Sequence, residues 1–389
     1  MEEIISLKDM KFPKGCPKVE FYRKPTYCEI VLYLFEKCNL RCEFCFQEHD
    51  HAKINYTYIK HLPEAAFQLM SKELRAYPTI KSFDIRMLGG EIFSDDLPDS
   101  LLDLYGDVVK EIRAKMKEYY PDVNVDFICT TNGVWKNRDR IKKFLKKYSF
   151  KNIISISIDF IGRYPTPEVK QTAYDTMYNL AMDEFYVRAG VVLTKRNIEY
   201  ILKNPEEFKD LIRKYKAEQI VFNYYSPNKQ WKLDLPSDED LWQIYKFCLD
   251  ERMFNVSTIF YLLEAYKQQT FFTKTCECKF IPTLTETKCT KDCVTTASPL
   301  SPERFYGKYL PEVTEENVSD VKASLGLVKR GCLGCDHYQY CPQPCWCMVI
   351  FDGYKATNCP MKRAFEYIKN NPELMQEYES WRVNSSNFN

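Results

Sequence analysis

Apolar runs with the character of β-strands alternate with stretches of helical spacing along residues 28–224. Six such runs are present: CEIVLYLF from 28, SFDIRML from 82, VNVDFICTT from 123, NIISISI from 152, FYVRAGVVL from 185 and QIVFNYY from 219. Between the second and third runs, Leu101, Leu104, Tyr105 and Val108 recur at helical intervals. Strands that alternate with helices predict an α/β fold, in which right-handed crossovers join the strands of a parallel sheet.

The alternation also divides the chain into regions. Residues up to 27 are punctuated by proline, and we expect them to cover one end of the sheet. Helical spacing continues beyond the sixth strand, and cysteines then become frequent before a last helix expected near residues 361–380. The expected organisation is an N-terminal lead over 1–27, an α/β unit over 28–232, a helical linker over 233–270, and a cysteine-rich domain with a C-terminal helix over 271–389.

Charge and hydropathy exclude several classes of partner. The chain has 55 basic and 54 acidic residues, a balance of +1, so no long-range field attracts nucleic acid or an anionic membrane. No apolar run reaches the roughly 20 residues that cross a bilayer, and the N-terminal residues do not resemble a signal peptide. We therefore predict a cytoplasmic protein, in which 17 cysteines indicate metal binding rather than disulfides.

Three cysteines follow the first predicted strand within one short loop. The segment CNLRCEFC sets Cys38, Cys42 and Cys45 in a Cys-x3-Cys-x2-Cys array. Thiolates are the ligands of iron–sulfur clusters, and three of them occupy three corners of a four-iron cluster and leave the fourth iron open. The alternatives are a zinc knuckle or three buried thiols, although zinc sites usually take four ligands in two pairs.

Ten further cysteines lie between residues 271 and 359. A central run has the spacing Cys-x2-Cys-x5-Cys-x3-Cys from Cys332. A zinc ribbon is the alternative interpretation because Cys-x2-Cys pairs suit zinc, but it does not explain the longer spacings. The ten residues are Cys276, Cys278, Cys289, Cys293, Cys332, Cys335, Cys341, Cys345, Cys347 and Cys359. We expect the other four, Cys16, Cys28, Cys129 and Cys248, to be inert buried thiols.

The first cysteine loop resembles the signature of the radical S-adenosylmethionine (SAM) superfamily. This resemblance implies a partial (β/α)6 TIM-like barrel, in which ligands gather at the carboxyl ends of the strands. It also implies that Cys38, Cys42 and Cys45 hold the catalytic cluster, whose open iron binds SAM and cleaves it to a 5'-deoxyadenosyl radical. Phe44, the aromatic residue before the third cysteine, would then lie near the adenine.

Three further motifs stand where predicted strands end. Gly89, Gly90 and Glu91 resemble the GGE motif of the family, which binds the amino group of SAM, although paired glycines commonly make a simple turn. Thr131 and Asn132 resemble its TNG turn, which lines the site and is also a common strand-ending turn.

The fourth strand ends in an S-x-D pattern. In the family the matching residues bind the SAM ribose and carboxylate, which assigns Ser157 and Asp159 to the cofactor site. An arginine often follows in relatives, and here Arg163 and Arg188 are both candidates. That assignment stays open.

The later cysteines match the core of the SPASM extension found in radical SAM peptide and protein maturases. By resemblance, one auxiliary cluster takes the ligands Cys332, Cys335, Cys341 and Cys359. The other takes Cys345, Cys293 and two of Cys276, Cys278 and Cys289. Its ligand set stays open because Lys288 stands where relatives have glycine, and Cys347 has no assigned role.

The resemblance as a whole predicts a radical SAM oxidoreductase that modifies a ribosomally made precursor peptide through a thioether or carbon–carbon cross-link. It would use three 4Fe–4S clusters and SAM, an electron donor such as flavodoxin or ferredoxin, and its own surfaces or a separate protein to bind the leader peptide. One alternative is an anaerobic sulfatase-maturing enzyme, which forms formylglycine; Val294 stands where those enzymes have Asp. Another is a non-catalytic iron–sulfur or zinc scaffold, against which the motifs at the strand ends count.

Overall fold

The computed structural model describes the regions that carry the sheet, the first cysteine loop and the C-terminal helices. Cys276, Cys293, Cys332, Cys345 and Cys347 lie outside the described residues. The described residues are 27–45, 54–76, 78–148, 150, 153–224, 235–269, 278–280, 284–285, 288–289, 335–337, 340–341 and 358–385.

A parallel seven-stranded sheet organises the fold, in the order β6-β5-β4-β3-β2-β1-β7. The strands are β1 (Tyr27–Tyr33), β2 (Ser82–Leu88), β3 (Asn124–Thr131), β4 (Ile153–Ser157), β5 (Tyr186–Leu193), β6 (Gln219–Tyr224) and β7 (Cys278–Phe280). The six strands expected from the sequence and their parallel arrangement are confirmed. The seventh was not expected: β7 pairs with β1, with Val31 opposite Phe280. A short antiparallel pair, β8 (Leu284–Thr285) and β9 (Lys288–Cys289), completes the described strands.

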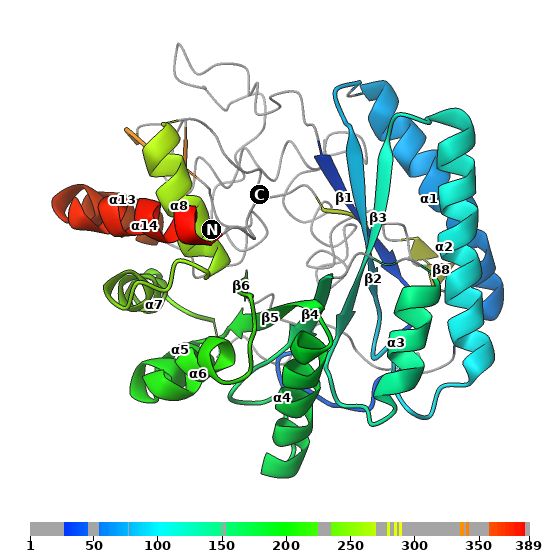
Figure 1. The fold of residues 1–389 in the computed structure, drawn as a ribbon, viewed down its shortest axis with the longest axis horizontal. Helices are drawn as coiled ribbons and strands as arrows, with labels where there is room; N and C mark the ends of the chain where they lie inside the picture. The colour runs from blue at the N-terminus through cyan, green and yellow to red at the C-terminus, as the bar shows by residue number, and fades with distance from the viewer. Residues whose placement is uncertain are drawn as a thin grey trace, which may run out of the picture.

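Helices follow the strands in alternation and cover the outside of the curved sheet (Figure 1). After β1 to β5 come α1 (Tyr56–Ala76), α2 (Asp99–Tyr119), α3 (Arg138–Lys147), α4 (Pro167–Met182), and the pair α5 (Lys195–Lys203) and α6 (Pro205–Arg213). After β6 come α7 (Asp238–Asp250) and α8 (Ser257–Gln268), where we expected a helical linker. No helix of the described chain is long and apolar enough to cross a membrane. The sheet and its outer helices form the expected partial barrel.

The C-terminal region contains two helices rather than the single helix expected over 361–380. They are α13 (Pro360–Asn370) and α14 (Glu373–Asn384). The break falls at Pro372, whose ring has no N–H to donate and disfavours helical backbone in the preceding residue. Helix α14 is anchored by the fully buried Glu264 of α8, which accepts hydrogen bonds at 2.5 Å from Tyr378 and from Arg382.

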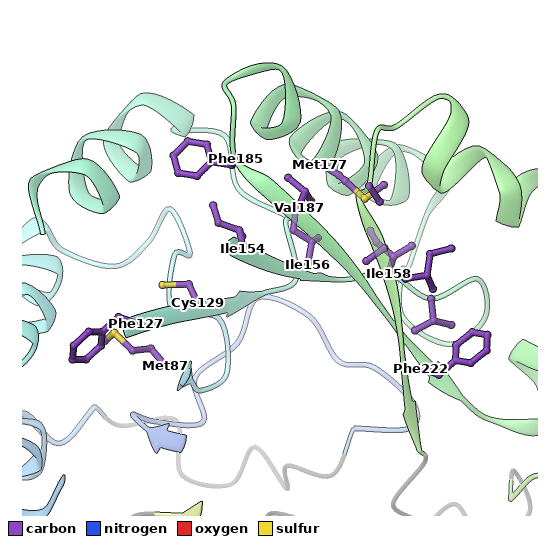
Figure 2. Packing of buried hydrophobic residues seen from close by; sticks show 14 of the residues in the cluster. Met87, Phe127, Cys129, Ile154, Ile156, Ile158, Met177, Phe185, Val187 and Phe222 are labelled. Atoms are coloured by element: carbon purple, nitrogen blue, oxygen red, sulfur yellow. The ribbon is translucent and has the colours of Figure 1, made fainter. Parts of the chain in front are cut away.

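The hydrophobic core lies between the sheet and its helices. Figure 2 shows Met87, Phe127, Ile154 and Val187 on the strands, with Met177 contributed by α4. Cys129 also lies in this layer, and Cys28 and Cys248 are buried as well, so the prediction of buried thiols is confirmed for these three. Strand side chains alternate between the two faces of a sheet, which leaves the residues between these core positions for the inside of the barrel.

The inner face of the sheet carries several polar side chains. Arg86 on β2 donates a hydrogen bond to the Thr130 hydroxyl on β3 at 3.2 Å. Ser155 on β4 stands opposite Arg188 on β5 in the strand register. Barrels of this kind bind ligands at the carboxyl ends of their strands, so these polar side chains favour a polar ligand there.

Candidate functional site

The first cysteine loop leaves the carboxyl end of β1 and carries three half-buried cysteines, Cys38, Cys42 and Cys45. The loop folds back on itself, because the Cys45 N–H donates to the Cys42 carbonyl at 3.1 Å and the Leu40 N–H donates to the Cys38 sulfur at 3.4 Å. Burial raises the pKa of Cys38 to about 11 and also raises the pKa of Cys42. Without a metal, the Cys38 thiol is therefore protonated at neutral pH.

The GGE turn after β2 packs against the backbone that leads into this loop. Gly90 donates its N–H to the Phe35 carbonyl at 2.7 Å, and Glu91 donates its N–H to the Lys37 carbonyl at 2.9 Å. A side chain at Gly90 would place its Cβ 1.9 Å from the Lys37 oxygen. Glycine is required here because two backbone segments meet with no room for a Cβ.

The Glu91 carboxylate is fully buried beneath the site. It accepts hydrogen bonds from the Phe93 N–H at 2.9 Å, the Thr131 hydroxyl at 2.7 Å and the Asn132 N–H at 2.6 Å. Burial raises the pKa of Glu91 to about 7, and the three hydrogen bonds act in the opposite direction. These contacts give Glu91 a part in holding the TNG turn; binding of the SAM amino group by GGE stays a prediction.

The TNG turn at the end of β3 is joined to the cysteine loop by two amide side chains. Asn132 donates from Nδ2 to Asn39 Oδ1 at 2.8 Å, and Asn39 donates from Nδ2 to the Val134 carbonyl at 2.6 Å. The Asn132 Nδ2 atom also lies 3.7 Å from the Cys38 sulfur. Gly133 adopts a φ of 73°, a left-handed conformation that favours glycine. Asn132 thus contacts the cysteine loop directly, and Thr131 contacts Glu91. The contact of these two residues with SAM stays a prediction.

The S-x-D pattern ends β4 with one half-buried and one fully buried residue. Ser157 is half-buried, and its carbonyl accepts a hydrogen bond from the Tyr164 hydroxyl at 3.2 Å. Asp159 accepts hydrogen bonds from the Val192 N–H at 2.7 Å and from Asn197 Nδ2 at 2.9 Å. Burial raises the pKa of Asp159. The Asp159 carboxylate therefore joins β4 to the end of β5, and its predicted contact with SAM stays a prediction.

The sequence left Arg163 and Arg188 as candidates for the arginine of the site, and the structure shows which of them lies against the cysteine loop. Arg163 donates from Nη1 to the Cys42 sulfur at 3.5 Å and from Nε to Asp159 at 2.6 Å. Its guanidinium lies 5.3 Å from the centre of the buried Phe44 ring. Arg188 lies on β5 over the Tyr186 ring, and its buried Nε has no hydrogen-bond partner among the described residues. Arg163 is therefore the candidate that contacts the cysteine loop.

Sequence reasoning missed several residues that hold the loop in place. The Glu43 N–H donates to the Gly162 carbonyl at 2.7 Å, and Arg196 forms an ion pair with Glu43 at 2.7 Å. Asn39 and Asn197, described above, were also missed. No motif marks these residues, because each acts through a partner far away in the chain. Their only sequence signal is a polar side chain near a strand end.

Part of the predicted auxiliary cluster region is described. Cys335, Cys341 and Cys359 are half-buried cysteines, and Cys359 precedes α13 directly. The Cys341 N–H donates to the His337 carbonyl at 2.9 Å, and the His337 ring stacks on Phe365 of α13 at 4.8 Å. The segment that carries Cys335 and Cys341 thus packs on the helix that Cys359 precedes. Cys278 and Cys289 lie on β7 and β9.

The donor set of the first loop fits an iron–sulfur cluster. Cys38, Cys42 and Cys45 offer only sulfur, which such clusters require. N–H groups from Leu40 and Arg163 already point at two of the sulfurs. Among the described residues, no three His, Cys, Asp or Glu side chains lie close enough together to hold a single metal ion. In a cluster each thiolate binds a different iron, so its ligands lie farther apart than those of one ion.

Comparisons with known proteins concern the fold. Neither a protein-family model nor a curated protein matches this chain. The structure of histidine-tagged anSMEcpe with bound AdoMet (SAM) aligns with a TM-score of 0.59 at 15% identity, over 91% of this chain and 99% of that one. Native anSMEcpe with bound AdoMet and the Cp18Cys peptide gives a TM-score of 0.58 at 13% identity, over 92% and 100%. Streptococcus suis SuiB bound to S-adenosylmethionine gives 0.47 at 14% identity, over 88% and 80%.

At such low identity the comparisons establish the fold. The described strands, their order and the helices between them agree with the α/β architecture expected from the sequence. This protein therefore has the partial TIM-like barrel fold of anSMEcpe, a protein whose structure was solved with AdoMet bound.

Proposed function

We infer that this protein is a radical SAM enzyme, with a 4Fe–4S cluster on Cys38, Cys42 and Cys45 and SAM bound beside it. The observation that carries this inference is the position of the three thiols. They share one loop at the carboxyl ends of the strands, and residues that end β2 and β3 or follow β4 hold that loop by hydrogen bonds. The fold shared with an AdoMet-bound protein supports the same conclusion.

The cofactors carry the difficult chemistry: when bound, the cluster would deliver one electron to SAM, whose cleavage yields a 5'-deoxyadenosyl radical that removes hydrogen from the substrate. The chain holds the thiols, orients SAM and keeps water away from the reacting atoms. Phe44 suits the last task, because it lies within the cysteine loop and is only 6% exposed. The proposed SAM contacts stand at neighbouring strand ends and are Gly89, Gly90, Glu91, Thr131, Asn132, Ser157 and Asp159.

Two auxiliary clusters complete the proposed cofactor set. One would use Cys332, Cys335, Cys341 and Cys359, and its two described segments pack together through His337 and Phe365. The other would use Cys345, Cys293 and two of Cys276, Cys278 and Cys289. Together they would provide the acceptor for the one electron that is released when the substrate radical forms a new bond.

The proposed substrate is a ribosomally made peptide. The anSMEcpe structures with the Cp18Cys and Kp18Cys peptides show peptides bound to that protein, and the same fold here supports a peptide for this chain. The proposed reaction is a thioether or carbon–carbon cross-link. A net charge of +1 gives no strong electrostatic steering, so the peptide would be recognised through local contacts. The proposed electron donor is flavodoxin or ferredoxin, and a separate protein could present the leader.

The test is SAM cleavage under oxygen-free conditions. Reconstituted protein is incubated with SAM and dithionite, and 5'-deoxyadenosine is measured by chromatography. We expect turnover by the wild type, none by the variant Cys38→Ala/Cys42→Ala/Cys45→Ala, and wild-type turnover by Cys248→Ala, which removes a buried thiol of α7. Absence of 5'-deoxyadenosine from wild-type protein with a full cluster would contradict the proposal.

A further inference from the structure

Arg163 joins a fully buried carboxylate to one thiol of the cysteine loop. Its Nε donates to Asp159 at 2.6 Å, and its Nη1 donates to the Cys42 sulfur at 3.5 Å. The Arg163 side chain is only 10% exposed. One guanidinium therefore makes both contacts from a position that is largely shielded from water.

The surroundings hold this guanidinium in one orientation. The Asp159 carboxylate is itself fixed by the Val192 N–H and by Asn197 Nδ2. The planar fork of arginine carries several N–H donors at fixed angles, so fixing Nε on Asp159 also aims Nη1. The Phe44 ring, 5.3 Å from the guanidinium, limits its movement on one face. These contacts thus direct the Arg163 guanidinium toward the Cys42 sulfur.

The backbone keeps Arg163 in register with the cysteine loop. Gly162 adopts a φ of 78°, and its carbonyl accepts the Glu43 N–H at 2.7 Å. A Cβ at Gly162 would lie 3.2 Å from a Glu43 carboxylate oxygen, so the two segments meet closely. Cys42 directly precedes Glu43 in the chain, and Arg163 directly follows Gly162. Their approach therefore follows from the path of the backbone as well as from the side chains.

We propose that Arg163 is a positioning residue that donates an N–H···S hydrogen bond to the Cys42 thiolate and thereby raises the reduction potential of the cluster. This inference rests on the proposed function. One electron from the reductant takes the cluster from its 2+ to its 1+ state and adds negative charge to the cluster and its sulfur ligands. A hydrogen-bond donor favours the more negative state. Arg163 keeps its proton throughout, because arginine stays charged in proteins.

The competing role for Arg163 is a contact with SAM alone. In that case the arginine would affect SAM affinity and leave the SAM-free cluster unchanged. Measuring the potential without SAM separates the two roles. The signal of this cluster is taken as the part of the EPR spectrum that the Cys38→Ala/Cys42→Ala/Cys45→Ala variant lacks.

The experiment is an EPR-monitored redox titration of reconstituted wild type, Arg163→Lys and Arg163→Gln without SAM. Lysine can keep the ion pair with Asp159, but it lacks the fork that reaches Cys42 at the same time. We expect the reduced state to become about tenfold less favourable in Arg163→Lys, a shift of about 59 mV to more negative potential for a one-electron couple. Arg163→Gln should shift in the same direction.

Arg196→Gln is the matched control. Arg196 pairs with Glu43 in the same loop at 2.7 Å, and its side chain is 40% exposed. Its removal should leave the potential unchanged. Thermal melting of the metal-free proteins checks folding, and Arg163→Lys decides the matter if Arg163→Gln does not fold.

The outcomes are distinguishable. An unchanged potential in folded, cluster-loaded Arg163→Lys overturns the role of Arg163, whether or not SAM affinity falls. An equal shift in Arg196→Gln also overturns it, because any loss of charge near the loop would then have the same effect. Absence of the cluster from the wild type overturns the proposed function, and this inference with it.

Discussion

Thr131 donates its hydroxyl hydrogen to Glu91 at 2.7 Å, although the two residues are 40 positions apart in the chain. The same hydroxyl oxygen accepts hydrogen bonds from Trp135 Nε1 at 2.9 Å and from the Gly133 N–H at 3.1 Å. Because its lone pairs are used in this way, Thr131 must act toward Glu91 as a donor. The contact joins the GGE and TNG turns beneath the cysteine loop, and it requires an acceptor at position 91.

Glu91→Gln should therefore destabilise the metal-free protein. An amide of the same size places an N–H group against either the Asn132 N–H or the Thr131 hydroxyl, and buried polar groups lose a partner. We expect the free energy of unfolding to fall by about 1–3 kcal/mol, measured by urea titration at pH 8, above the pKa of about 7 of the native carboxyl. Glu199→Gln is the control, because that side chain is 47% exposed, and it should change stability by less than about 0.5 kcal/mol. Equal losses in the two variants would count against the inferred role of Glu91.

The reactivity of Cys38 in the metal-free protein should report its raised pKa. The thiolate is the reactive form, and burial raises the pKa of Cys38 from 9.0 to about 11. Alkylation by iodoacetamide should therefore be slow at pH 8 and should rise about tenfold per pH unit without levelling off near pH 9. Peptide mass spectrometry gives the rate at each pH. A plateau at or below pH 9 would show that the thiol is not shifted in this way, and loading the cluster should block the reaction.

Iron analysis tests the number of clusters. Three cysteines lie in one loop and ten in a separate region, so reconstituted protein should hold about twelve irons in three four-iron clusters. The variant Cys38→Ala/Cys42→Ala/Cys45→Ala should hold about eight. The measurement is iron and sulfide per chain in anaerobic preparations. Zinc in place of iron, or a single metal ion for the ten later cysteines, would refute this count.

The auxiliary clusters should matter more for product formation than for SAM cleavage. Cys335 lies in the segment that packs on α13, away from the first loop in the sequence. Cys335→Ala should still release 5'-deoxyadenosine with dithionite, because the first cluster keeps all three of its thiols. The amount of modified peptide should fall much further, by tenfold or more. A tenfold loss of rate corresponds to about 1.4 kcal/mol of activation free energy. If a folded Cys335→Ala loses both activities equally, the auxiliary clusters instead supply electrons to the first cluster.

The mass of the product distinguishes the possible peptide reactions. Candidate precursor peptides with several residues on each side of the target are incubated with SAM under reducing, oxygen-free conditions. A cross-link removes two hydrogens for each modification, and this is the expected result. An unchanged mass with one deuterium gained from heavy water would indicate epimerisation. Conversion of a cysteine to an aldehyde would favour the sulfatase-maturing alternative.

The sequence alone was sufficient for the six strands β1 to β6 and for predicting which main motifs lie near one another. A strand such as SFDIRML can be recognised from its own residues, because the pattern of apolar positions that predicts a strand lies within a short stretch of the chain. Parallel strands bring their carboxyl ends to one edge, so Cys38, Glu91 and Asn132 could be placed together without coordinates. The spacing of the later cysteines is equally local, although several of them lie outside the described residues.

Only the tertiary structure decided which arginine contacts the cysteine loop. Arg163 and Cys42 are 121 positions apart, and nothing in either segment marks them as partners. The sequence also did not show that β7 pairs with β1, or that Thr131 donates a hydrogen bond to the buried Glu91. The physical reason is that periodicity and turn chemistry depend on neighbouring residues, whereas these contacts depend on how several loops pack together at one end of the barrel.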